Sequence, residues 1–153
     1  MALSTSHINS LLWGNPYTRP YFLGTFPSCA IEKLPRKKSY CFVTNVGHHN
    51  SKGSHWTAWH VQDGVVTFMD SFGRSPLDPA FPHDYRDILL KFKDFRFADK
   101  KIQNVKSYAC GYFAVHFLLC MCSGLDINDF LSEYSSDTNK NDVIVMKIIK
   151  SFI

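Results

Sequence analysis

The chain has 153 residues, of which 45% are hydrophobic and 15% aromatic, a composition that excludes a disordered protein and indicates one globular domain over residues 1–153. No apolar run reaches the roughly 20 residues of a membrane-spanning helix, and the N-terminus lacks a signal-peptide pattern, so we expect an intracellular protein without membrane contact. The net charge of +4 suits either an ordinary surface or a polyanion partner.

The N-terminal half of the sequence predicts one helix followed by strands. Residues 4–13 form the helix, which begins at a serine cap and ends at Gly14-Asn15-Pro16. Residues 39–46 are rich in β-formers and predict a strand, whereas the polar residues 47–53 predict a loop. Residues 55–61 and 65–70 predict two paired strands that are joined by an Asp-Gly turn.

The C-terminal half predicts mostly helices. Apolar side chains recur at helical spacing in residues 83–92, 126–134 and 139–152, and residues 101–105 predict a further strand. Residues 110–122 predict a helix with almost no polar side, which we expect to be buried. Residues 92–97 alternate phenylalanine with charged residues, a pattern typical of a half-buried strand or of a helix end.

Four residues around the buried helix have the chemistry of acyl transfer. Cys110 begins the helix, where the positive end of the helix dipole favours a thiolate nucleophile. His55 begins a strand and is a candidate base, which Asp70 can orient from the end of the next strand if the two strands pair. The N–H of Cys110 and the side-chain amide of Gln103 are candidate donors to an oxyanion, and Gly111 is expected to leave the helix start open to substrate.

The same residue types have simpler interpretations. A lone Cys-Gly before an apolar helix is more often a buried thiol than a nucleophile. Five cysteines without regular spacing predict free thiols in a reducing compartment, and we interpret Cys29, Cys41, Cys120 and Cys122 as buried ones. A metal site made of His116, Cys120 and Cys122 is disfavoured, because Cys122 points away from the other two on a helix, so no metal is expected.

Three segments resemble the active-site segments of the adenovirus maturation protease family, adenain: GSHWTAWHV, TFMDSFGRSP and KKIQNVKSYACGYFAVHFLLCMCSG. PYFLGTF (residues 20–26) also resembles a segment of that family, so the resemblance runs from about residue 20 to residue 124. His-Trp, acid-x-Phe-Gly and Gln-x6-Cys-Gly are specific in this order. The ubiquitin-like-modifier proteases of the same superfamily typically have a shorter gap and an Asp-Cys-Gly, where this chain has Ala109-Cys110-Gly111.

The resemblance implies an α+β fold in which helices flank a central mixed β-sheet and the nucleophile stands at the N-terminus of a buried helix, as in papain-like cysteine proteases. It implies that Cys110 is the nucleophile, His55 the general base, Asp70 the orienting acid and Gln103 an oxyanion-hole donor. The acid is often Glu in adenain, so the shorter Asp70 requires a strand register that brings it nearer to the histidine.

The resemblance also implies a substrate class, namely viral capsid and core precursor proteins that are cleaved after glycine. Gly53 matches a loop glycine of the family's substrate cleft. Trp56 follows the base and is expected in the core or the cleft wall, and Gly111 completes the residues that we expect near substrate.

Adenain is activated by DNA and by a capsid-derived peptide that is disulfide-linked to a cysteine before the glutamine segment. This chain has no cysteine between Asp70 and Gln103, so a disulfide-linked peptide is not expected there. The sequence requires no cofactor and leaves open activation by DNA or by a capsid peptide that is not disulfide-linked. Basic residues in segments 35–38 and 91–106 are available for DNA. We expect a monomer that acts on protein substrates in the virion and the host nucleus.

Two other functions stay open. A deubiquitinase or a protease of SUMO-like modifiers uses the same four groups and differs only in its substrate. A catalytically inactive virion or DNA-binding protein would keep the fold without the reaction. Selective alkylation of Cys110 that is lost in a His55→Ala variant separates an enzyme from the inactive protein.

Overall fold

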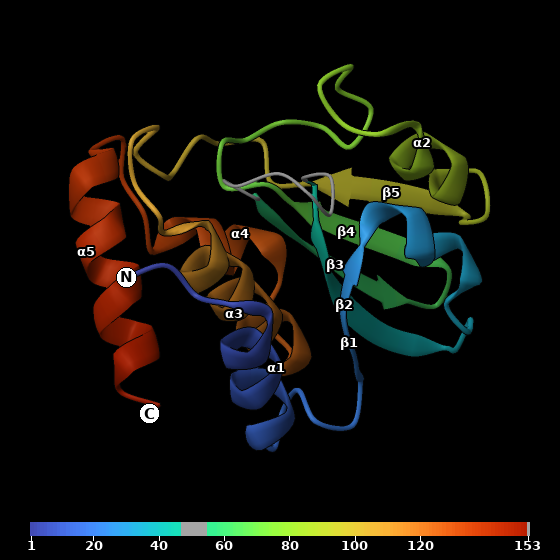
Figure 1. The fold of residues 1–153 in the computed structure, drawn as a ribbon, viewed down its shortest axis with the longest axis horizontal. Coiled ribbons are helices and arrows are strands. Elements are labelled where there is room, and N and C mark those ends of the chain that lie inside the picture. Colours follow the sequence, from blue (N-terminus) through green and yellow to red (C-terminus); the bar gives the residue numbers. More distant parts are fainter. Residues whose placement is uncertain (47–54, 153) are drawn as a thin grey trace.

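Five strands form one mixed sheet in the order β1-β2-β3-β4-β5 in the computed structural model, which describes residues 1–46 and 55–152 (Figure 1). The outer pairs, β1 with β2 and β4 with β5, are parallel, and the two central pairs are antiparallel. The predicted α+β fold with a mixed sheet is therefore confirmed. The strands are β1 (Phe22–Pro27), β2 (Ser39–Asn45), β3 (Trp56–Gln62), β4 (Val65–Met69) and β5 (Asp94–Phe97).

Helices cover both faces of the sheet, and α1, α3, α4 and α5 gather on one side of it in Figure 1. The other face packs against α2 and the short 3-10 helix η1. None of the helices in the described ranges is long and apolar enough to cross a bilayer. The helices are α1 (Thr5–Gly14), η1 (Ser28–Lys33), α2 (His83–Leu89), α3 (Cys110–Cys122), α4 (Ile127–Ser132) and α5 (Thr138–Lys150).

The central strands are buried on both faces because their side chains alternate between two cores. On the face of α2, Phe42, Trp59 and Phe68 are neighbours across three strands, with ring centroids 5.7 and 4.7 Å apart. On the opposite face, Val43 and Ala58 belong to the core around α3. This double burial explains why the sequence of β3 shows only partial alternation.

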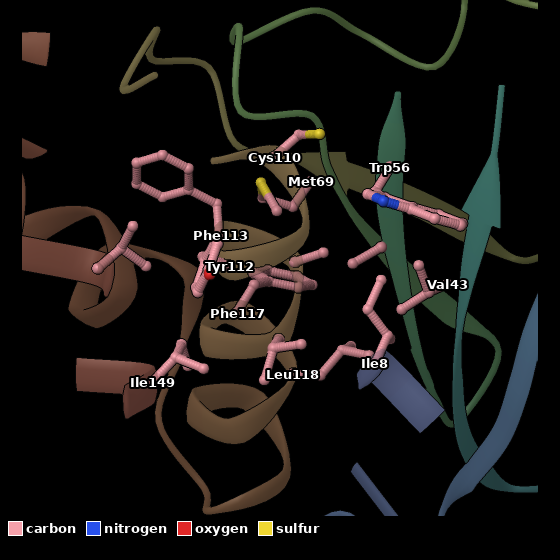
Figure 2. Close-up of a cluster of buried hydrophobic side chains, with 14 of the residues drawn as sticks. Ile8, Val43, Trp56, Met69, Cys110, Tyr112, Phe113, Phe117, Leu118 and Ile149 are labelled. Carbon is pink, nitrogen blue, oxygen red and sulfur yellow. The ribbon is translucent and has the colours of Figure 1, made fainter. Parts of the chain in front are cut away.

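The helix α3 is buried along most of its length, as its lack of a polar side predicts. It packs against β3 on the helical face of the sheet. Figure 2 shows Phe117 and Leu118 within this core, close to Ile8, and Cys110 at the end of α3. The same packing that buries the helix therefore fixes the position of its first residue.

One predicted strand and the predicted burial of one cysteine are wrong. Residues 101–105 form no strand: the N–H groups of Ile102 and Gln103 both donate to the carbonyl oxygen of Ser71, which gives a loop instead of a ladder. The strand that pairs with β4 at this edge of the sheet is β5, earlier in the chain. Its alternating residues Phe95 and Phe97 are half-buried against the core around α2. Cys29 is exposed on η1 rather than buried.

A buried hydroxyl network joins α2 to the sheet. The hydroxyl of Tyr85 lies 2.6 Å from Thr44 Oγ1 and 2.7 Å from Thr57 Oγ1, and Trp59 Nε1 donates to Thr44 at 3.1 Å. Burial raises the pKa of Tyr85 to about 12, although hydrogen bonds from the two threonines act in the opposite direction. Tyr85 therefore stays a neutral donor and acceptor that links three elements.

We predict that Tyr85→Phe lowers the free energy of unfolding by about 1–3 kcal/mol, because it removes the Tyr85 hydroxyl from its buried hydrogen bonds with Thr44 and Thr57. Urea denaturation followed by fluorescence measures the change. Tyr17→Phe is the matched control, because Tyr17 is 59% exposed, and it should shift the free energy by less than about 0.5 kcal/mol. Equal effects of the two substitutions would contradict the prediction.

Candidate active site

The β3–β4 hairpin brings two of the predicted site residues together. Its turn is the predicted Asp63-Gly64, and both residues have positive φ, 52° and 79°, as a tight hairpin turn requires. Ala58 pairs with Met69, so the residues just before β3 and just after β4 lie at the same end of the hairpin. His55 and Asp70 occupy these places, and Nε2 of the imidazole hydrogen-bonds Oδ1 of the carboxylate.

The helix α3 supplies the third group. Cys110 is its first residue and lies near enough to His55 to raise the pKa of the imidazole, and because Nε2 contacts Asp70, Nδ1 is the ring nitrogen left for the cysteine. Cysteine, imidazole and carboxylate thus lie in this order at one end of the sheet. The cysteine and the imidazole line a cavity of about 700 Å³, whose lining includes His55, Trp56, Phe72, Arg74, Gln103 and Cys110, with residues 2–5 of the N-terminal segment.

The imidazole is held in its protonated form. Burial alone would lower the pKa of His55, but hydrogen bonds with Asp70 and Cys110, together with the charges of these groups, raise it to about 9. Burial likewise opposes ionisation of Asp70, yet its hydrogen bonds to His55 and Arg74 keep the pKa of this carboxyl below its usual value. At neutral pH the site therefore contains an imidazolium beside an ionised, fully buried carboxylate.

Two residues of the following loop support this pair and were not singled out from the sequence. Arg74 donates from Nε to Oδ2 of Asp70 at 2.7 Å and from its backbone N–H at 3.2 Å, so both carboxylate oxygens have partners. Phe72 stacks on the His55 ring, with centroids 5.0 Å apart and planes at 17°. The feature of the sequence that could have indicated Arg74 is its place four residues after Asp70 in the same loop.

Gln103 reaches the same cavity from the loop before α3. Only 1% of its surface is exposed, and its amide contacts the hydroxyl of Ser71 and both oxygens of Ser107. As the first helical residue, Cys110 has a backbone N–H without an acceptor inside α3. Two N–H donors, one from the backbone and one from a side chain, thus border the thiol.

The residues predicted to lie near substrate differ in their positions. Trp56 lines the cavity and donates from Nε1 to the carbonyl oxygen of Leu3 at 3.2 Å, so it ties the N-terminal segment to the cavity wall. Gly111 does not face the cavity, contrary to the expectation that it opens the helix start. A Cβ added there would lie 3.1 Å from Leu3 and 3.2 Å from Trp56, so Gly111 permits close packing in the core. Gly53 lies outside the described residues.

The fold and the site define an α+β domain in which a cysteine at the start of a buried helix lies beside a histidine that is hydrogen-bonded to an aspartate. Its amino-acid sequence is similar to adenovirus proteases, which confirms the resemblance. The protease of bovine adenovirus B serotype 3 is 29% identical over 112 residues, and that of human adenovirus B serotype 3 is 30% identical over 111 residues. These matches cover 65% of this chain, which spans about half the length of the two relatives, 55% and 53%.

Two solved structures share the fold. An ASFV protease matches 92% of this chain with a TM-score of 0.63 and 13% identity, and the match covers 64% of that protein. ChlaDub1 of Chlamydia trachomatis matches 95% of this chain with a TM-score of 0.54 and 15% identity, and the match covers 71% of that protein. No model of a protein family matches the sequence.

We predict that the His55 ring titrates with a pKa of about 9, and that Asp70→Asn lowers this value because it removes the largest favourable interaction with the imidazolium. A pH titration of the ring resonances by NMR measures both. Because the pKa is raised from 6.5 in the folded state, the ring stabilises the fold fully below pH 6.5 and loses this contribution as the pH rises through about 9. A pKa unchanged by Asp70→Asn would contradict the assignment of Asp70.

Proposed function

We propose that this protein is a cysteine endopeptidase in which Cys110, His55 and Asp70 hydrolyse peptide bonds. The observation that carries the proposal is that His55 is hydrogen-bonded to a buried carboxylate and lines, together with Cys110, a cavity open to substrate. The similarity to adenovirus proteases supports it independently. A structural cysteine and histidine would need neither the cavity nor the buried charge.

The geometry supports a two-step reaction. Cys110 Sγ, as a thiolate, attacks the scissile carbonyl carbon, and the oxyanion accepts hydrogen bonds from the Cys110 N–H and from Gln103. The His55 imidazolium gives its proton to the leaving amine as the C–N bond breaks, which leaves a thioester and a neutral ring. His55 then takes a proton from a water molecule that attacks the thioester, and the C–S bond breaks to give a carboxylic acid and the Cys110 thiolate, with the ring protonated again.

The substrate class that we propose is viral capsid and core precursor proteins, cut after glycine, in the virion and the host nucleus. The similarity to adenovirus proteases supports this choice. The alternative is a protease that removes ubiquitin-like modifiers, which would use the same catalytic groups. Peptides with a glycine before an internal cleavage site, compared with modifiers extended at a C-terminal Gly-Gly, distinguish the two substrate classes by kcat/KM.

We further propose a DNA contact at the end of the sheet near the β3–β4 turn. Lys38 lies 3.8 Å from Asp63, and the N–H of Lys93 donates to Gly64 O at 2.8 Å. The turn therefore contacts both basic segments of the sequence, residues 35–38 and 91–106. One lysine of the second segment is used differently, since Lys100 Nζ donates to backbone carbonyls, including that of Tyr134 at 2.6 Å. The exposed basic residues near the turn are Arg36, Lys37, Lys38, Lys91 and Lys93.

An activating peptide, if the chain uses one, would bind without a disulfide. The described part of β5 pairs with β4 alone, so its other edge offers backbone groups to an added strand. Such a peptide would extend the sheet beyond β5. The neighbouring strand β4 ends just before the loop from Asp70 to Arg74.

We predict that Cys110→Ala abolishes peptide hydrolysis and leaves the fold intact, because the thiol is the nucleophile. Release of a fluorophore from a glycine-containing peptide measures the activity, and circular dichroism checks the fold. Cys29→Ala is the matched control, since Cys29 is exposed and distant in sequence from the site, and it should keep full activity. Hydrolysis at the wild-type rate by Cys110→Ala would refute the proposed function.

We predict that duplex DNA binds with an affinity that falls steeply with salt. A Lys37→Glu, Lys93→Glu variant should reduce the slope of log K against log salt concentration by about two, because each lysine that contacts a phosphate adds about one. Fluorescence anisotropy of a labelled duplex gives the slope. Lys147→Glu, on the exposed side of α5, should leave it unchanged. Equal slopes for both variants would rule out this surface.

A further inference from the structure

The side-chain amide of Gln103 is held at both ends by serines. Its Nε2 lies 3.1 Å from the carbonyl oxygen of Ser107 and 3.2 Å from the hydroxyl oxygen of the same residue. Its Oε1 accepts a hydrogen bond from the hydroxyl of Ser71. Ser71 is fully buried and Gln103 is 1% exposed, so the contact between these two residues is shielded from water.

The network decides which end of the amide faces which serine. A backbone carbonyl only accepts hydrogen bonds, so the group of Gln103 that faces Ser107 O has to be the NH₂ group. The hydroxyl oxygen of Ser107, 3.2 Å from Nε2, likewise acts as an acceptor for the NH₂ group. The carbonyl end of the amide therefore faces Ser71, whose hydroxyl is the donor.

We propose that Ser71 is a positioning residue for Gln103: by donating to Oε1 it keeps Nε2 as the end of the amide that serves the oxyanion beside Cys110. This inference rests on the proposed function and deepens it. An amide turned over would present Oε1, a partial negative charge, to the oxyanion. Because Nε2 carries two protons, it can keep a bond to Ser107 and give the other proton to the oxyanion.

The backbone of Ser71 makes the coupling tighter. Its carbonyl oxygen accepts from the N–H groups of Ile102 at 2.9 Å and Gln103 at 3.1 Å, which pins the loop before α3 to the end of β4. The preceding residue, Asp70, holds His55. One dipeptide, Asp70-Ser71, therefore supports both halves of the site, the base through Asp70 and the oxyanion donor through Ser71.

A double-mutant cycle on the full chain tests the proposal, with kcat and KM measured on one glycine-containing peptide. Gln103→Ala should lower kcat by about 10²–10³-fold, the loss typical of one oxyanion donor. Ser71→Ala should lower kcat by about tenfold and leave KM within about twofold, because orientation matters only in the transition state. In the Gln103→Ala background, Ser71→Ala should change kcat by less than about twofold, since the amide it orients is gone.

Ser75→Ala is the matched control on the same loop, because its hydroxyl accepts from Leu77 N–H and does not contact Gln103, and it should leave kcat unchanged. Equal losses from Ser71→Ala in both backgrounds would show a merely structural role and overturn the proposal, as would no loss in the wild-type background. If Ser71→Ala does not fold, Ser71→Cys enters the same cycle, and its weaker donor should give a smaller loss that also disappears without Gln103. Failure of the proposed function is a separate outcome, because Cys110→Ala would then retain hydrolysis.

Discussion

The burial of α3 against the sheet is the constraint on which the site depends. An apolar helix without a polar side has to be enclosed, and here it is enclosed by β3 on one side and by α1, α4 and α5 on the others. Its first residue is then placed at the end of the sheet where the hairpin strands begin and end. Cys110 meets His55 because the helix can be buried in few ways, and not because a local contact holds the thiol.

The second constraint is electrostatic and acts on the hairpin. A carboxylate that is fully buried is stable only with partners for its charge, and Asp70 has two, His55 and Arg74. Arg74 in turn lies over the Phe81 ring at 4.5 Å, so the loop after β4 is fixed by packing as well as by charge. The arrangement raises the pKa of His55 and defines its orientation through the same hydrogen bond. Removal of either cation from Asp70 would leave a buried charge half satisfied.

The sequence predicts those site residues that belong to a recognisable local pattern. The Asp-Gly turn and the two β-rich runs suffice to place His55 near Asp70, and the apolar run identifies the helix of Cys110. The partners that depend on loop geometry could not be found in this way. Ser71 and Ser107 are ordinary residues in the sequence, and only the folded path of residues 98–109 brings them to Gln103. The same loop explains why residues 101–105 looked like a strand, since buried Ile102 serves the core without pairing.

A second thiol with an altered pKa, Cys122, lies at the C-terminal end of α3 and affects how thiol labelling is interpreted. Cys122 Sγ lies 3.7 Å from Cys41 Sγ, and the hydrogen bond between them lowers the pKa of Cys122 and raises that of Cys41, with His60 lowering the pKa of Cys122 further. Cys122 is only half-buried, so it is not the inert core thiol that its apolar surroundings suggest. Cys122, 12 residues after Cys110 on the same helix, is therefore disposed to ionise. Alkylation therefore identifies the nucleophile only if the labelled cysteine is mapped and its rate of alkylation depends on His55. Labelling of Cys122 should not depend on His55, because the imidazole that lowers the pKa of Cys122 is that of His60.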